Sequence, residues 1–292
     1  MTNFLNLKNK KILITGAARG IGLETARSLH QKGAQVALVG LEPEALKNIC
    51  QELGSGATYF EADVSDPKKM QKAVDFCANE MKGIDAVIAN AGIYHISSLF
   101  DAPTNAVEHT LNVNLFGVWH TMRASLPHLK ASRGYFLTIS SMAAITHGPL
   151  MGAYAASKAG VEALSDSLRF EVKQDGIDVG VAYFGAIDTD LVSGGKQNKA
   201  LSLVESVSPK FIREPVPTSK AVAAIEKGII QRSSRICTPS WINIALLTRG
   251  LLQPLMEKKF LNDRRIWRSV EVSREVNQTK VSQLGVAETA KQ

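Results

Sequence analysis

The sequence contains little cysteine. Its three cysteines, Cys50, Cys77 and Cys237, lie far apart and without C-x-x-C spacing. This spacing excludes a disulfide-stapled scaffold and offers no thiolate metal site. We therefore expect free thiols, no bound metal and a cytoplasmic location.

Long hydrophobic runs are also absent. The longest nearly apolar stretch, residues 241–247, is far shorter than the roughly 20 residues of a membrane-spanning helix. Residues 1–11 lack the apolar centre that a secretory signal has. The sequence thus predicts neither a signal peptide nor a transmembrane span.

Positive charge is in moderate excess, with a net charge of +7 and a pI of about 9.3. The basic residues are spread along the chain, and they are not interleaved with its few aromatic residues. A nucleic-acid interface would gather both kinds of side chain on one face. We expect no nucleic-acid partner, and assign the charge to a solvated surface and, in part, to an anionic cofactor or a polyanionic substrate.

What the chain does contain is a regular alternation of short apolar runs with segments of helix length. With 45% apolar residues in 292, it can bury a sizeable core. Short, continuously apolar strands that alternate with helices are typical of a parallel sheet covered on both faces. The sequence therefore predicts an α/β fold with a doubly wound, Rossmann-like parallel sheet and a ligand crevice at the carboxyl ends of its strands. The expected strands are residues 11–15, 35–39, 57–60, 84–89, 135–139, 177–183 and 235–238.

Helix signals lie between these strands. Gly33 ends the first helix, Asp66-Pro67 begins the third, and Pro103-Thr104 precedes a long helix expected to run towards Pro127. Residues 190–217, which include Gly194-Gly195, show no clear period, and we predict a mobile loop over the site there.

The end of the chain differs in composition from the rest. After a helix over 217–231 and the last strand, a mostly apolar helical segment is expected over 241–260, followed by a charged tail with a disordered end. We predict one catalytic and cofactor-binding domain over 1–240, and a helical extension with a flexible tail over 241–292.

A glycine-rich loop follows the first strand directly. Thr15-Gly-Ala-Ala-Arg-Gly-Ile-Gly22 leads into a helix, with glycines at 16, 20 and 22. Glycines let the backbone approach a pyrophosphate, and the helix N-terminus offers free N–H groups. The pattern indicates dinucleotide binding; the alternative is a tight turn without a ligand.

The end of the second strand bears on the choice between NAD and NADP. An acidic residue there would bind the ribose hydroxyl and repel a 2′-phosphate, but this chain has Gly40. Arg19 is near enough in sequence to meet that phosphate. We therefore favour NADP(H), with NAD(H) as the alternative, because Glu42 follows closely and Arg19 could equally be a surface residue.

Three side chains suit proton transfer to a carbonyl. Tyr154 and Lys158 lie four residues apart at the start of a helix, so they share one face. Ser141 ends the fifth strand, at the edge where the crevice is expected. A tyrosine has an ordinary pKa of about 10, and a neighbouring ammonium together with an oxidised nicotinamide lowers it. Each residue alone is ordinary, but their joint spacing indicates a catalytic site.

With these residues in place, the sequence resembles the short-chain dehydrogenase/reductase family, in its simple non-extended branch, over residues 10–240. The matching motifs are the three glycines, Ala62-Asp63-Val64, Ala89-Asn90-Ala91-Gly92, Asn114 within Val113–Gly117, Ser141, Tyr154 and Lys158.

The resemblance implies catalytic roles. Tyr154 would transfer the proton, Ser141 would orient the carbonyl, and Lys158 would hold the nicotinamide ribose and lower the tyrosine pKa. Asn114 would position a water that links Lys158 to solvent.

It also implies the cofactor contacts. Asp63 and Val64 would border the adenine, and the turn Gly185-Ala-Ile187-Asp-Thr189 would meet the carboxamide. Ala89 and Phe184 depart from the family pattern. The implied cofactor-binding residues are Gly16, Arg19, Gly20, Ile21, Gly22, Asp63, Val64, Asn90, Gly92, Tyr154, Lys158, Gly185, Ile187 and Thr189.

Five residues are candidates for lining the substrate pocket: His95, Met142, His147, Met151 and Phe184. The two histidines lack a further ligand at metal spacing, so they are either substrate contacts or ordinary loop residues. The methionines either form an apolar wall or fill gaps in the core.

The extension leaves several partners open. Residues 241–260, with Arg264, Arg265 and Arg268, combine apolar and basic character, which suits peripheral membrane contact, packing on the domain or packing on another subunit. By family analogy, helices that begin near Thr104 and Gly152 pair between subunits, which predicts a homodimer or homotetramer.

The predicted function is an NADP(H)-leaning oxidoreductase that moves a hydride between nicotinamide and a small-molecule carbonyl or alcohol, bulky and apolar in character. The alternative is a catalytically silent dinucleotide-binding regulatory or scaffold protein.

Overall fold

The computed structural model describes residues 6–190, 192 and 198–289, with side chains described as far as Asn277. Within these residues the strands form one sheet in the order β3-β2-β1-β4-β5-β6-β7, and every neighbouring pair is parallel. This confirms the doubly wound α/β prediction. The strands are β1 (Lys11–Thr15), β2 (Gln35–Gly40), β3 (Ala57–Glu61), β4 (Ala86–Ala89), β5 (Tyr135–Ser141), β6 (Asp178–Phe184) and β7 (Arg235–Thr238).

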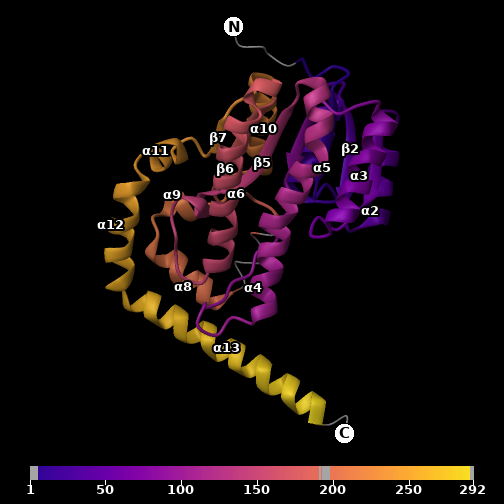
Figure 1. Cartoon of the computed structure of the whole chain (residues 1–292). Helices are drawn as coiled ribbons and strands as arrows, with labels where there is room; N and C mark the ends of the chain where they lie inside the picture. The colour runs from indigo at the N-terminus through magenta and orange to yellow at the C-terminus, as the bar shows by residue number, and fades with distance from the viewer. Residues whose placement is uncertain (1–5, 191, 193–197, 290–292) are drawn as a thin grey trace.

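Helices cover both faces of the sheet (Figure 1). One core cluster joins the sheet to α1 (Gly20–Gln31), α2 (Pro43–Leu53) and α10 (Thr218–Gln231). The other joins it to α3 (Pro67–Met81), α5 (Gly117–Ser132) and α6 (Gly152–Glu171). Burial on both faces explains why the strand sequences are continuously apolar rather than alternating.

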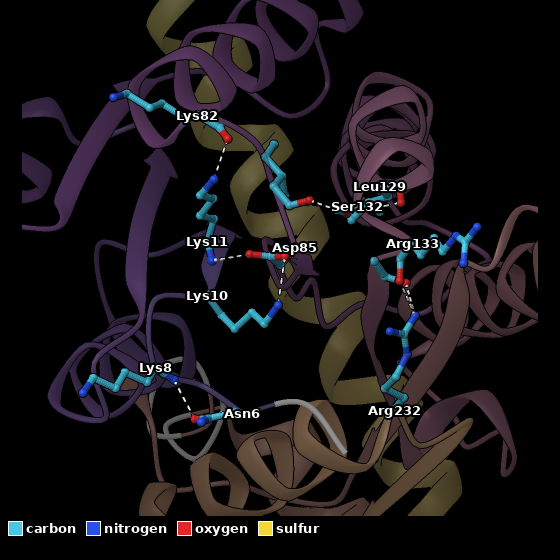
Figure 2. Close-up of polar contacts among 12 residues, drawn as sticks. Asn6, Lys8, Lys10, Lys11, Lys82, Asp85, Leu129, Ser132, Arg133 and Arg232 are labelled. Atoms are coloured by element: carbon cyan, nitrogen blue, oxygen red, sulfur yellow. Dashed lines mark hydrogen bonds and ion pairs between the residues drawn. The ribbon is translucent and has the colours of Figure 1, made fainter. Parts of the chain in front are cut away.

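The amino-terminal edge of the sheet is held by polar side chains (Figure 2). The Asp85 carboxylate accepts hydrogen bonds from Lys11 N at 3.0 Å and from Lys10 Nζ at 3.2 Å. This use of Asp85 explains why β4 begins at Ala86 instead of residue 84. Arg232 Nη2 donates to the carbonyl of Arg133 at 2.6 Å, which ties α10 to the start of β5. Such bonds stabilise the edge opposite the ligand crevice.

The long helix expected after Thr104 is present but extends further. It consists of α4 (Thr104–Leu111), a π-helical segment (Asn112–Phe116) and α5, which continues past Pro127 to Ser132. The helix thus runs towards Pro127, as expected, and continues one turn beyond it. Packing of α5 on the sheet and on α3 compensates for the one hydrogen bond that the proline cannot donate.

Residues 190–217 contain regular structure that their composition did not indicate. They include α8 (Lys199–Val207), which the Asn198 side chain caps by accepting from Ala200 N and Leu201 N, and α9 (Lys210–Arg213). The expectation of an irregular loop was therefore wrong for this part, while Gly194-Gly195 lies outside the described residues. Short 3-10 turns occur at Met142–Ala144 and Lys173–Asp175.

The C-terminal segment forms three helices in place of one helix and a tail. These are α11 (Ile242–Leu247), α12 (Arg249–Leu261) and α13 (Arg264–Thr289). Thr248 ends α11 and begins α12 with a non-helical backbone, which divides the expected single helix. Helix α13 packs against α8 around Val204, Val207 and Ile266. This apolar contact stabilises the charged segment as a helix. The division of the chain into a catalytic domain over 1–240 and an extension over 241–292 stays a prediction.

Candidate active site

The point at which the strand order reverses, where folds of this kind bind ligands, lies between β1 and β4, because the chain leaves β1 towards β2 on one side and returns to β4 on the other. The glycine loop begins there. Gly16 has φ +64°, and a Cβ on it would lie 2.7 Å from Ala91 Cα. A Cβ on Gly22 would collide with the Gly16 carbonyl oxygen. Both positions therefore require glycine, since the loop is packed closely against the end of β4.

The N-terminus of α1 is open to an anion. Arg19 precedes the helix in an extended conformation, its side chain makes no cap, and the first turn contains no acidic residue. Thr189, from the segment after β6, lies above Gly20, with its Cγ2 3.7 Å from where a Cβ would be. Backbone N–H groups and the positive end of the helix dipole are thus available for a phosphate, which fits the predicted dinucleotide.

Asn90 braces this loop. Its Nδ2 donates to the carbonyls of Thr15 at 3.0 Å and Gly16 at 3.1 Å. The Thr15 hydroxyl oxygen in turn accepts from the backbone N–H groups of Asn90 at 3.0 Å and Ala91 at 3.1 Å. The side chain predicted to contact cofactor therefore positions the phosphate loop from the neighbouring strand.

The end of β2 carries an ion pair. Arg19 Nη2 lies 3.5 Å from Glu42 Oε1, and Glu42 Oε2 lies 3.6 Å from where a Cβ of Gly40 would be. Position 40 has no acidic side chain, but the Glu42 carboxylate lies next to it.

The predicted adenine-contacting residues follow β3. Asp63 Oδ1 accepts from Ser65 N at 2.8 Å and from Ser65 Oγ at 2.7 Å, which fixes the turn. Val64 is buried against Gly117 of α5.

Tyr154, Lys158 and Ser141 come together at the carboxyl edge of β5. Lys158 Nζ lies 5.7 Å from the centroid of the Tyr154 ring and donates to the carbonyl of Ile139 at 2.8 Å. The Ser141 hydroxyl interacts with the Tyr154 phenol. It also accepts from Ala143 N at 3.1 Å. Helix α6 is held on the strand because Ser140 Oγ donates to the carbonyl of Lys158 at 3.1 Å. The spacing in sequence thus becomes one site in space.

Asn114 lies beside this group, in the π-helical segment. Its Oδ1 accepts from Ile93 N at 2.8 Å, and its Nδ2 donates to the Ile93 carbonyl at 2.9 Å and to Ser157 Oγ at 3.1 Å. A Cβ on Gly92 would lie 3.3 Å from Asn114 Oδ1 and 3.5 Å from Lys158 Nζ. Gly92 therefore leaves the space that brings the amide and the ammonium close to each other.

Comparison with known proteins agrees with this geometry. The short chain dehydrogenase family matches residues 10–200. The chain belongs to the short chain dehydrogenase family. It is accordingly an NAD(P)-dependent oxidoreductase that acts on alcohol or carbonyl groups.

Individual members of the family differ in how much of the chain they match. It is 29% identical over 261 residues to 11-beta-hydroxysteroid dehydrogenase 1A of Arabidopsis thaliana, covering 86% of this chain and 74% of that protein. It is 34% identical over 194 residues to an uncharacterized oxidoreductase of Listeria innocua, covering 64% of this chain and 78% of that protein. The fold matches 3-ketoacyl-(acyl-carrier-protein) reductase from Brucella melitensis, solved with NADH, at a TM-score of 0.70 and 22% identity, covering 80% and 97% of the two chains.

Burial dominates the electrostatics of this short chain dehydrogenase site. It raises the pKa of the Tyr154 phenol, which the hydrogen bond with Ser141 opposes, and it lowers the pKa of the Lys158 ammonium to about 8. The two pKa values are thus moved apart, because each group loses solvation of its charged form. Burial therefore shifts the Tyr154 pKa in the direction opposite to the lowering expected from Lys158 and an oxidised nicotinamide.

Tyr94 is a site residue that the sequence reasoning missed. Its ring packs edge-on against Tyr154, with centroids 5.2 Å apart, and burial raises its pKa. Its place two residues after Gly92, just beyond the strand-end motif, was the available signal. Tyr94 forms one wall around the reactive phenol.

The predicted substrate residues are divided between the site's border and the core. Met142 packs under α11, and Phe184 is buried in the core cluster of the α1 face, so its ring packs inside the domain. His147 is exposed and its N–H donates to Gln253 Oε1 at 2.9 Å. His95 and Met151 are partly exposed in the segments after β4 and before α6.

Gly185, Ile187 and Thr189 form the turn after β6. Ile187 is buried and pairs with Val216 in an isolated bridge, and Thr189 Oγ1 donates to the Ile187 carbonyl at 3.3 Å. Ile21 packs partly against the core of the α1 face.

In the part of the chain that the structure describes, no helix is long and apolar enough to cross a membrane. No group of three or more His, Cys, Asp or Glu side chains in this part of the chain is placed to hold a metal ion.

Proposed function

We propose that this protein is an NADP(H)-leaning reductase or dehydrogenase that transfers a hydride between nicotinamide and a bulky, apolar carbonyl or alcohol. The observation that carries the proposal is the placement of Lys158 Nζ 5.7 Å from the Tyr154 ring, with Ser141 bound to the same phenol. A silent sensor would need the glycine loop but not this group of side chains.

A nicotinamide held at this site would supply the hydride for the carbonyl carbon, or accept it in the reverse direction. Tyr154 Oη gives a proton to the carbonyl oxygen as the hydride arrives. Ser141 Oγ, already hydrogen-bonded to the phenol, orients that oxygen. Lys158 favours the phenolate through its charge and returns the proton.

Asn114 supports this relay. The buried amide is held by both backbone groups of Ile93, and Gly92 leaves room for it beside Lys158. We assign it the positioning of a water between the ammonium and solvent.

The cofactor would lie along the carboxyl ends of β1, β2 and β4. Its pyrophosphate fits the α1 N-terminus, where Gly16, Gly20 and Gly22 admit close approach, and the carboxamide fits the turn of Ile187 and Thr189. Arg19 and the lack of a side chain at Gly40 support NADP(H). Glu42 beside them supports NAD(H), which stays the alternative.

A bulky, apolar substrate is supported by the walls of the site. Helices α12 and α13 reach the two segments that border it, since Ser98 N donates to Ser273 Oγ at 3.0 Å and His147 N bonds Gln253. The apolar contact of α8 with α13 lies alongside Leu150. A relative named as a hydroxysteroid dehydrogenase points in the same direction.

We further propose a cytoplasmic homodimer or homotetramer. Phe116 and Trp119, at the junction of the π-helical segment and α5, expose apolar surface of the kind that subunit interfaces use. The three cysteines are free and partly or fully buried, which suits a reducing compartment.

NADPH oxidation measured against a panel of ketones and aldehydes tests the function. Tyr154→Phe should lower turnover by about 10²–10⁴-fold with NADPH binding retained, because only the transferable proton is removed. Tyr59→Phe, on β3, is the matched control and should leave turnover unchanged. Cofactor binding without turnover on any substrate would instead support the sensor.

A further inference from the structure

Helices α11 and α12 carry large apolar side chains on the outside of the molecule. Ile244, Leu247, Leu251 and Leu255 are all exposed, Leu247 to 85% and Leu251 to 72%. Both helices lie at the outer edge of the fold (Figure 1). Helix α11 packs on β6 through Ile242 and Ala245, but this contact leaves the four exposed side chains uncovered. We call these four residues, with Leu261, the outer apolar surface.

Two exposed leucines of α12 lie on one face of the helix together with a lysine. Leu251, Leu255 and Lys258 stand at i, i+4 and i+7, which places them above one another on one side. Leu261 is also exposed, and Trp267 at the start of α13 is more than half exposed while its indole N–H donates to the Leu261 carbonyl at 3.0 Å. Leucines with a hydrogen-bonded tryptophan beside them suit a boundary between water and an apolar phase.

Positive charge is concentrated in the same segment. Residues 249–268 contain six basic and two acidic side chains, a net charge of +4 out of the chain's +7. Lys258 and Arg264 are exposed within this segment, and a lysine on the apolar face can extend its ammonium to a charged surface. Arg249 is paired with Glu162 and Arg268 with Glu271 and Glu275, so the positive charge beside the exposed leucines is carried chiefly by Lys258, Lys259 and Arg264.

We propose that the outer apolar surface binds the face of an anionic phospholipid membrane. Leu251 and Leu255 enter the boundary between headgroups and acyl chains, and the exposed Lys258 and Arg264 meet the lipid phosphates. A second copy of the chain fits this surface less well, because a two-fold contact would bring two patches together that each expose Lys258 and Arg264.

Flotation of the full-length protein with vesicles tests the proposal. Vesicles of phosphatidylcholine mixed with phosphatidylglycerol should carry the protein, and vesicles of phosphatidylcholine alone should carry much less. The double variant Leu251→Ser/Leu255→Ser should bind at least about tenfold more weakly, because two side chains that enter the membrane lose their apolar area. Lys258→Gln should weaken binding about fivefold, and added salt should weaken it further.

Phe170→Ser is the matched control, because it removes an exposed apolar side chain from the end of α6. Its vesicle binding should equal that of the unchanged protein. Since all substituted side chains are exposed, circular dichroism and reductase activity should stay as they are. Failure of the unchanged protein to float with anionic vesicles overturns the proposal, as does binding that the double variant retains. The proposal would also be overturned if the unchanged protein and the Phe170→Ser control formed a concentration-dependent dimer that the double variant does not form. That result would assign the surface to a second copy of the chain.

Discussion

Arg249 Nη1 donates to Glu162 Oε1 at 2.8 Å and so joins the C-terminal helices to α6, the helix that carries Tyr154 and Lys158. Glu162 lies one turn after Lys158 on the same helix, and its side chain is only 8% exposed. A buried carboxylate without its partner is costly, so this contact holds α12 in place.

Arg249→Ala should therefore lower the free energy of unfolding by about 1–3 kcal/mol, reduced from the value for a fully buried pair because the arginine is 50% exposed. Chemical denaturation measures this. Adding Glu162→Gln should restore most of the loss, since the uncompensated charge is removed. Arg268→Ala, which breaks an exposed pair, is the control and should change stability by less than about 0.5 kcal/mol. Equal effects of the two arginine variants would contradict the assignment.

Lys158 should give the fold a distinctive pH dependence. Burial lowers the pKa of its ammonium to about 8 from an ordinary 10.5. Between these values the unfolded chain binds this proton and the folded chain does not, so the contribution of Lys158 to unfolding free energy rises with pH. From pH 8 to 10 the wild type should gain about 2 kcal/mol relative to Lys158→Met in denaturant titrations.

In the comparison with Lys158→Met, the contributions of other titrating groups to the pH dependence cancel. Burial raises the pKa of Cys50 and of Cys237 to about 11, so these thiols lower stability as pH rises, but they do so equally in both proteins. Burial also raises the pKa of Tyr154, so this phenol lowers stability as pH rises, as the thiols do, but only above about pH 10. A stability difference that stays constant from pH 8 to 10 would show that the ammonium is solvated.

Glu42 should oppose NADP binding. Its carboxylate lies 3.5 Å from Arg19 and next to Gly40, where a 2′-phosphate would be placed. Glu42→Gln removes the repulsion and frees the guanidinium, so the ratio of NADP to NAD affinity should increase about five- to tenfold. Cofactor titration by fluorescence measures both affinities. Glu44→Gln, two residues further on in the first turn of α2, should leave this affinity ratio unchanged. If both variants shift the ratio alike, Glu42 does not oppose NADP binding.

Gly22→Ala should damage the phosphate loop. The added methyl would collide with the Gly16 carbonyl and lie 2.6 Å from Asn90 Nδ2, and neither a loop backbone nor its brace can easily move. We expect a loss of about 2 kcal/mol in thermal or chemical unfolding, together with weaker cofactor binding. Gly250→Ala, where no atom lies within 4 Å of the new methyl, should instead gain up to about 1 kcal/mol. Similar stability of the two variants would contradict the packing seen around Gly22.

Local sequence patterns were enough to predict much of the fold and the arrangement of its site. Continuously apolar runs indicated the parallel sheet, because both of its faces are covered, and the carboxyl ends of parallel strands necessarily meet at one edge. That edge receives Gly16, Asn90 and Ser141 from three strands. Tyr154 and Lys158 share a face because a helix repeats about every four residues. These relationships follow from backbone geometry within or next to single elements.

Other features depended on how distant segments pack. The contact of Tyr94 with Tyr154, the bond of Arg249 with Glu162 and the packing of α13 on α8 all join residues far apart in the chain. Asn90 became a brace for the phosphate loop only because β4 lies beside β1. Likewise, composition alone could not tell whether the leucines of 241–261 face the core or solvent. Such contacts depend on side-chain burial against partners that no local period specifies, and tertiary packing decides them.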